Sequence, residues 1–181
     1  MEFWQAQVGD RLQPLQRLER HAVIALLQRC IQHAFEVNAE RFRSEVDPVP
    51  LRLIEAALDD LRQVAQSGML TPETQRIHEE LGAMPPLSEL TGDFALGFDS
   101  IRSAIICSIG YLDALEQYRE GCATDAIWYA YESISLHAVN DIILRTGARL
   151  SEQGVTLLEA EVPVCQREIA FQLECLRLVQ I

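Results

Sequence analysis

The chain has 181 residues and a mass of 20.4 kDa, a length that suits one domain built around one hydrophobic core. Hydrophobic residues make up 49% and charged residues 23% of it, which is typical of a folded globular protein and excludes a mainly disordered chain. The 27 acidic residues outnumber the 15 basic ones, so the formal net charge is −12. This charge disfavours nucleic acid and anionic membranes as partners and favours a basic protein.

Missing targeting signals and the pattern of cysteines indicate the cellular compartment. No apolar run approaches the roughly 18 residues of a transmembrane helix, and the stretch Met1–Gln5 lacks the positive charge of a signal peptide. The five cysteines form no Cys-x-x-Cys pair, so we interpret them as reduced thiols in a core. We therefore expect a cytoplasmic protein without a membrane segment.

The first predicted element is long. Between Leu12 and about Phe42, apolar residues recur at steps of three and four, which predicts one long helix or two nearly collinear ones. The middle of this segment, residues 22–27, is apolar on every side. A helix of that kind needs neighbours all round, so we place it at the centre of the fold.

Two shorter helices and a connector are predicted next. Asp47 caps a helix that Gly68 ends, and Thr71 caps a short helix that ends by Gly82. The stretch 83–97 contains two prolines and two glycines, too many helix breakers for a regular element. We interpret it as a Pro/Gly-rich connector.

Two further helices are predicted between residues 99 and 146. Asp99 or Ser100 opens the first and Gly121 ends it, whereas Thr124 caps the second, which runs to Gly147. The short junction favours an antiparallel hairpin. The apolar stripes that support these helices are Ile101, Ile105, Ser108, Leu112 and Leu115 in the first, and Ile127, Tyr131, Ile134, Ala138 and Ile142 in the second.

The C-terminal region contains a polar patch at Ser151–Gly154 and a last helix from Val162 almost to Ile181, with Pro163 in its first turn. No stretch shows the period-two alternation of a strand. The sequence therefore predicts an all-α fold: a single-domain bundle of six or seven helices over residues 1–181.

Sequence motifs for catalysis, metals and cofactors are missing. There is no Glu-x-x-His pair, no Gly-x-Ser-x-Gly, no Gly-x-Gly-x-x-Gly and, in a chain without lysine, no phosphate-binding Gly-Lys motif. Two helical patterns, Cys30 with His33 and Glu36, and His137 with Asp141, each supply at most half of a metal site. We interpret both as hydrogen bonds or salt bridges on a helix, and predict neither metal nor cofactor.

Aromatic residues gather on the predicted hairpin. Trp128 and Tyr129 are adjacent, so both cannot point into one core, and Trp and Tyr dominate protein interfaces. Acidic residues beside them would steer a basic partner; packing against the Pro-rich connector is the alternative interpretation. The predicted partner-binding residues are Glu116, Glu120, Asp125, Trp128, Tyr129 and Glu132.

The pattern of helices resembles the YjaG-like family of bacterial helical domains. The resemblance rests on Leu15–Glu19 before an apolar helix, on Leu51–Ile54, on the helix from Ser103 to Leu115 and on the one from Glu168 to Leu176. It implies a compact helical bundle from a bacterium, and it implies no active site.

Three functions remain open at this point. The first is a cytoplasmic protein-binding protein without catalysis, such as an immunity protein that neutralises a basic bacterial toxin by direct binding. The second is a housekeeping bundle of the YjaG-like kind, which could form a homodimer. The third is a ligand-binding or enzymatic bundle with a pocket near the connector.

Overall fold

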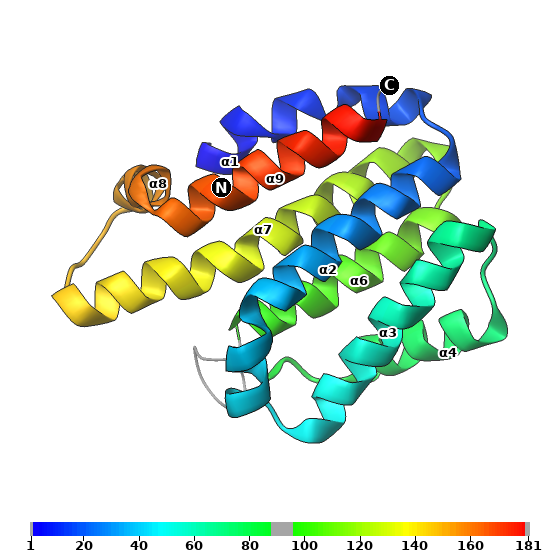
Figure 1. Cartoon of the computed structure of the whole chain (residues 1–181), viewed down its shortest axis with the longest axis horizontal. Coiled ribbons are helices and arrows are strands. Elements are labelled where there is room, and N and C mark those ends of the chain that lie inside the picture. Colours follow the sequence, from blue (N-terminus) through cyan, green and yellow to red (C-terminus); the bar gives the residue numbers. More distant parts are fainter. Residues whose placement is uncertain (1, 88–95, 180–181) are drawn as a thin grey trace.

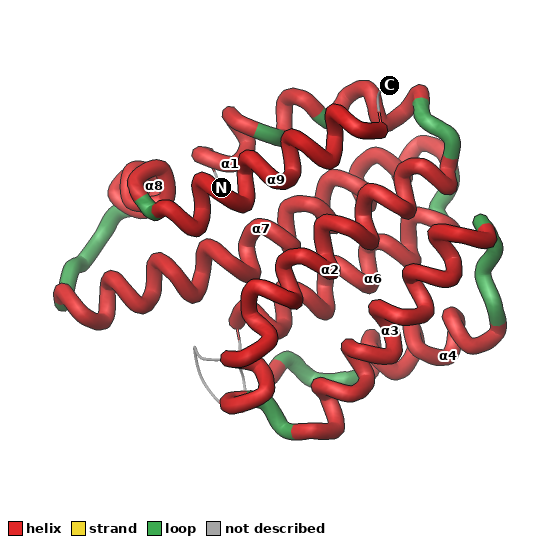
Figure 2. Tube along the Cα trace, in the orientation of Figure 1, coloured by secondary structure: helices red, strands yellow, loops and turns green. Residues whose placement is uncertain are grey.

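The computed structural model describes residues 2–87 and 96–179, and within these ranges every regular element is helical and none is a strand (Figure 2). The all-α prediction is confirmed, but the described residues form eight α-helices rather than six or seven. In chain order the elements are α1 (Glu2–Gln7), the 3₁₀ turns η1 (Gly9–Arg11) and η2 (Gln13–Arg17), α2 (Arg20–Glu45), α3 (Pro48–Ser67), α4 (Pro72–Ala83), α6 (Leu96–Asp113), α7 (Glu116–Thr146), α8 (Glu152–Glu161) and α9 (Pro163–Val179).

Helix α2 is the central element of the bundle. It packs against α3, α6, α7 and α9 (Figure 1). Val23, Ile24, Leu26 and Leu27 are all buried in the continuous hydrophobic core. This confirms the central position that the apolar stretch 22–27 predicts, but not neighbours on every side, because Ala25 is exposed.

The start of α2 differs from the prediction. The α-helix begins at Arg20 rather than near Leu12, because Leu18 and Glu19 are extended and the chain before them forms the two 3₁₀ turns. Leu12, Leu15 and Leu18 are spaced by three residues, which is the period of a 3₁₀ helix as well as one step of an α-helix. The apolar pattern alone does not separate the two.

Helices α3 and α4 end and begin where Gly68 and Thr71 predict, but the Asp47 side chain forms no capping hydrogen bond with α3, and α4 runs to Ala83, one residue beyond the predicted end. Gly68 adopts a left-handed conformation with φ of 70° and ends α3. Thr71 caps α4 in a reciprocal arrangement, since its side chain accepts from the backbone of Thr74 and the Thr74 hydroxyl accepts from the backbone of Thr71. Most of the predicted 83–97 connector, residues 88–95, lies outside the described residues.

The hairpin of α6 and α7 is confirmed, but its turn was predicted in the wrong place. Helix α6 ends at Asp113 and α7 begins at Glu116, so the turn precedes the predicted one by about two helical turns. Gly121 and Thr124 lie inside α7 instead of at helix ends. The real turn contains neither Gly nor Pro, so no local signal marks it.

The C-terminal region contains two helices where one was predicted. Ser151 caps α8 by accepting a hydrogen bond from the backbone of Gly154, and α8 is seen end-on beside the start of α9 (Figure 1). Pro163 stands at the start of α9, as predicted.

The N-terminal helix α1 was not predicted, because six residues are too few to show a helical period. It packs beside α8, and Trp4 is only 2% exposed. The Trp4 ring meets Trp128 of α7 edge to face, with ring centroids 5.3 Å apart. Trp4 thus docks the N-terminal helix on the bundle.

Candidate functional site

The six predicted partner-binding residues do not form one surface. All lie on α7, which has about 3.6 residues per turn. Glu116 and Glu120 share one side, whereas Asp125 follows Glu116 by two and a half turns and so lies on the opposite side. Tyr129 and Glu132 fall on the side of Asp125.

The residues on the Asp125 side face α6. Glu132 is half-buried and accepts a hydrogen bond of 2.9 Å from the Ser100 hydroxyl, and burial raises its pKa. Burial, together with the charge of Asp125, raises the pKa of the Cys107 thiol on α6 to about 11. Glu132 is therefore used in the contact between α6 and α7.

Trp128 is also used within the molecule. Its half-buried ring packs between Trp4 and Tyr131, with a centroid distance of 5.7 Å to Tyr131. Its indole serves to dock the N-terminal helix. Of the six predicted residues, Glu116 and Glu120 line a hollow in the surface.

That hollow lies at the turn between α6 and α7. It has a volume of about 750 Å³ and is bounded by η2, the residues that lead into α2 and the first turns of α7. Glu19, Glu116 and Glu120 contribute acidic groups to it, and Arg20 and Arg119 contribute basic ones. We call this hollow, together with the exposed turn residues 113–118, the turn surface.

Two large apolar side chains are exposed on the turn surface. Leu115 is 67% and Tyr118 is 60% exposed. Leu115 was predicted to lie on the apolar face of the first hairpin helix; it points outward because α6 has ended and Leu115 is extended, at the N-cap position of α7. Asp113, also exposed, adds a further carboxylate. The turn surface thus combines apolar contact area with an excess of acids.

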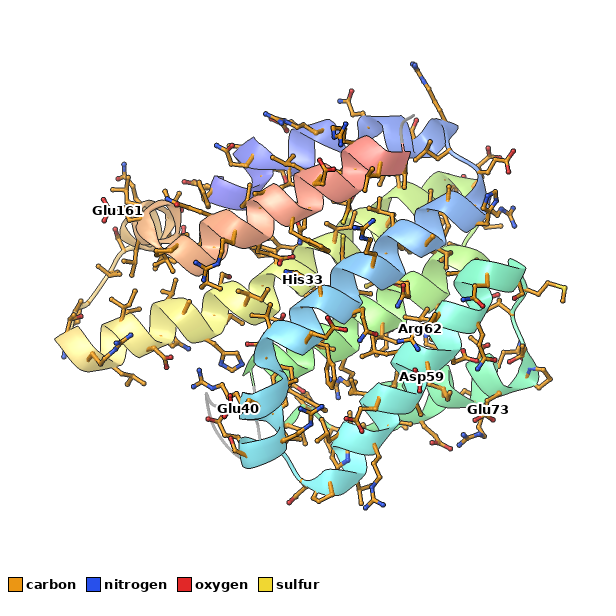
Figure 3. All side chains as sticks on the ribbon, viewed as in Figure 1. His33, Glu40, Asp59, Arg62, Glu73 and Glu161 are labelled. Carbon is orange, nitrogen blue, oxygen red and sulfur yellow. The ribbon has the colours of Figure 1, made fainter. Side chains whose placement is uncertain are left out.

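A buried polar layer joins α1, α2, α7 and α9. The Trp4 indole donates to Gln172 Oε1 over 2.8 Å, and Gln172 Nε2 donates to the Ile127 carbonyl and to Glu168 Oε1. Glu168 Oε2 lies 3.3 Å from His33 Nε2. His33 sits between α2 and α9 (Figure 3), with Phe171 stacked on its ring at 3.8 Å.

Burial sets the protonation of this layer. It raises the pKa of Glu168 to about 8 and lowers the pKa of His33. At neutral pH both side chains are therefore uncharged. Glu168 Oε2 is buried without a hydrogen-bond partner, although it lies 3.3 Å from His33 Nε2.

The Cys30–His33–Glu36 pattern gains partners from α9. Cys30 contacts Cys175, and His33 contacts Glu168. Glu36 does not join them, because it accepts a hydrogen bond from Gln32 instead. In the part of the chain that the structure describes, no three side chains converge as metal ligands would.

The two residues of the second pattern, His137 and Asp141, lie in different surroundings. His137 is buried beside Phe42, and burial lowers its pKa to about 4. Asp141 instead pairs with Arg41 of α2 at 3.4 Å. Asp141 thus forms its salt bridge with another helix rather than with His137, and His137 is a neutral core residue.

Sequence reasoning missed Leu115, Glu168 and Gln172. An exposed Leu115 requires knowledge of where α6 ends, and no turn residue marks that end. Glu168 and Gln172 are spaced by four like any polar pair on an amphipathic helix, and nothing local indicates that His33 and Trp4 lie opposite them.

Comparison of the chain with protein-family models, with curated proteins and with solved structures finds no match. The resemblance to the YjaG-like family therefore stays a prediction. Among the described residues no helix is both long and apolar enough to cross a membrane.

Proposed function

We propose that the chain is a cytoplasmic, non-catalytic protein that binds a basic protein partner through the turn surface. The observation that carries this proposal is the exposure of Leu115 and Tyr118 at the turn between α6 and α7. Glu116 and Glu120, on the side of α7 away from Tyr118, line a hollow there together with Glu19. Large apolar side chains ringed by polar groups mark interaction sites, and Tyr is enriched among the residues that contribute most binding energy.

The charge of the turn surface favours a basic partner. Asp113 and the three glutamates of the hollow outnumber Arg20 and Arg119, and Arg119 is held by the Ala114 carbonyl. The whole chain carries a charge of −12, which would speed the approach of a cationic domain. A basic bacterial toxin domain is a partner of this kind, and the chain would then act as its immunity protein by covering the cationic surface.

Site-specific crosslinking tests the location of the surface. A photoreactive phenylalanine analogue would be placed at Tyr118 and, as a matched control, at Val49, which is 73% exposed on α3. We expect a basic protein to be captured at Tyr118 and not at Val49. Equal capture at both positions, or capture of an acidic protein, would contradict the proposal.

The captured partner then allows a quantitative test. With both proteins purified, the double substitution Leu115→Ala and Tyr118→Ala should lower affinity about 30-fold, the loss typical of removing an interface anchor worth about 2 kcal/mol. Val49→Ala should leave the affinity unchanged. If the double variant binds within about twofold of the original chain, well under the hot-spot threshold, the anchor lies elsewhere.

A further inference from the structure

A second hollow lies next to the turn surface, beyond Gln16 and Glu120, which line both. It has a volume of about 1020 Å³ and runs between the η1–η2 segment and the C-terminal half of α9. Leu173 and Leu176 give it an apolar wall, and the rest of its lining is mainly charged or amide side chains. The volume lies at the upper end of the range for small-molecule sites.

The acids that line this hollow are already engaged. Asp10 accepts a hydrogen bond of 3.3 Å from Gln5. Glu174 accepts two, of 2.8 and 2.7 Å, from Arg177, and Glu120 accepts one from the Gln16 amide. Each carboxylate has at least part of its charge offset by a donor from the chain itself.

Two arginines in the same lining are not engaged. Arg11 and Arg17 stand at the ends of η1 and η2, and neither guanidinium forms an ion pair or hydrogen bond with another described residue. Each guanidinium offers about five N–H donors in a flat fork that matches carboxylate and phosphate oxygens. The unused hydrogen-bonding capacity of the hollow is therefore cationic, although its formal charges balance.

We propose that this hollow binds a small organic anion, with Arg11 and Arg17 holding its phosphate or carboxylate groups and Leu173 and Leu176 contacting its apolar part. Guanidinium groups bind both kinds of oxyanion through paired hydrogen bonds. The proposal does not rest on the protein-binding function, because it involves neither Leu115 nor Tyr118.

Isothermal titration calorimetry at low salt tests the proposal with three probes. Tripolyphosphate carries phosphate alone, citrate carries carboxylates alone, and ATP adds a flat ring system to phosphate. A net charge of −12 repels anions in general, so saturable binding would report a local site. Binding of tripolyphosphate or citrate would identify the preferred group, and tighter binding of ATP would show that the apolar wall contributes.

Paired variants locate the binding. The double substitution Arg11→Gln and Arg17→Gln should weaken the best probe at least tenfold. The control, Arg43→Gln with Arg149→Gln, removes two exposed arginines that do not line the hollow and should leave the affinity unchanged. Thermal unfolding would confirm that both variants fold.

Two results would overturn the proposal. One is the absence of saturable binding of all three probes up to about 5 mM, a concentration beyond the range of a specific site. The other is unchanged affinity in the Arg11 and Arg17 variant. Neither result bears on crosslinking at Tyr118, so the two proposals can fail separately.

Discussion

At the scale of single residues, Glu168 has the most unusual surroundings. Its side chain is 1% exposed, it receives one hydrogen bond from Gln172, and its nearest basic group is the neutral imidazole of His33. The other titratable groups close to it are the thiols of Cys30, Cys165 and Cys175, which are buried in the core. The folded chain therefore holds a proton on a carboxyl group that would be ionised in water.

This proton makes the stability of the fold depend on pH. The pKa of Glu168 rises from 4.5 to about 8 on folding. Between these values the folded chain binds a proton that the unfolded chain releases, so the free energy of unfolding contributed by Glu168 falls as pH rises. Burial of His33 and His137 acts in the opposite sense and lowers stability as pH falls below about 6.5.

Glu168→Gln should remove the alkaline part of this dependence. The amide keeps the shape of the protonated acid but cannot ionise, so we expect the variant to be more stable than the original chain at pH 9, by roughly 2 to 4 kcal/mol, and similar to it at pH 4. Urea unfolding at a series of pH values measures the effect. Glu161→Gln, on the exposed end of α8 (Figure 3), is the control and should change stability little at any pH. Equal responses of the two variants would show that Glu168 ionises freely.

At the scale of elements, helix ends that carry their own chemical signal were predictable and those that do not were missed. Gly68 and Gly147 end helices in left-handed conformations, and Thr71 caps α4 through its side chain. Ser151 caps α8 in the same way, but that helix was not predicted. Gly121 also predicts a helix end, but this prediction is wrong. It lies within α7 because the tertiary contact between α6 and α7 outweighs its weak preference for a helix end.

Two glycine substitutions test the position of the turn. An added Cβ at Gly121 would meet no atom within 4 Å, and alanine favours a helix interior, so Gly121→Ala should stabilise the fold by about 0.5–1 kcal/mol. At Gly147, where φ is +66°, the same substitution should destabilise it by about 1 kcal/mol. Thermal unfolding of both variants supplies the measurement. Destabilisation by Gly121→Ala would indicate that a helix ends at Gly121, as the sequence pattern predicts.

The candidate site could be predicted only in part, for a related reason. Glu116 and Glu120 are four residues apart and share a helix face wherever the helix begins. The exposure of Leu115 depends on the end of α6, and the burial of Trp128 depends on the distant Trp4. The spacing of residues along the chain predicts which side chains share one face of a helix. To predict a surface formed by several helices, one must also know how these helices are arranged in space.

At the scale of the whole molecule, acids and arginines are arranged unevenly. On the face formed by α3 and α4, Arg62 pairs with Asp59, and Arg76 pairs with Glu73 and Glu80 (Figure 3). These exposed pairs add little to stability but reduce the local charge. On the turn surface Glu19 lies 3.2 Å from His21 and Glu120 accepts from the Gln16 amide, whereas Asp113 and Glu116 form no ion pair with another described residue.

The central position of α2 has a consequence for local stability. Its buried residues contact helices on all sides, whereas α8 packs mainly on α9 and α1 and buries only Glu159. We expect backbone amides between Val23 and Phe35 to exchange with solvent most slowly and those of α8 to exchange much faster, because opening α2 requires the whole core to open. Hydrogen exchange followed by mass spectrometry measures both. Comparable protection of the two helices would argue against a bundle organised around α2.

The chain has two tryptophans, and both stand at the contact of α1 with α7. Their indoles lie close enough for the ring transitions to couple, so tryptophan emission excited beyond the tyrosine absorption, and the tryptophan bands of the near-ultraviolet dichroism, arise from this contact alone. These signals report, without a label, whether the N-terminal helix stays attached to the bundle. They do not respond to structural changes confined to α3 and α4.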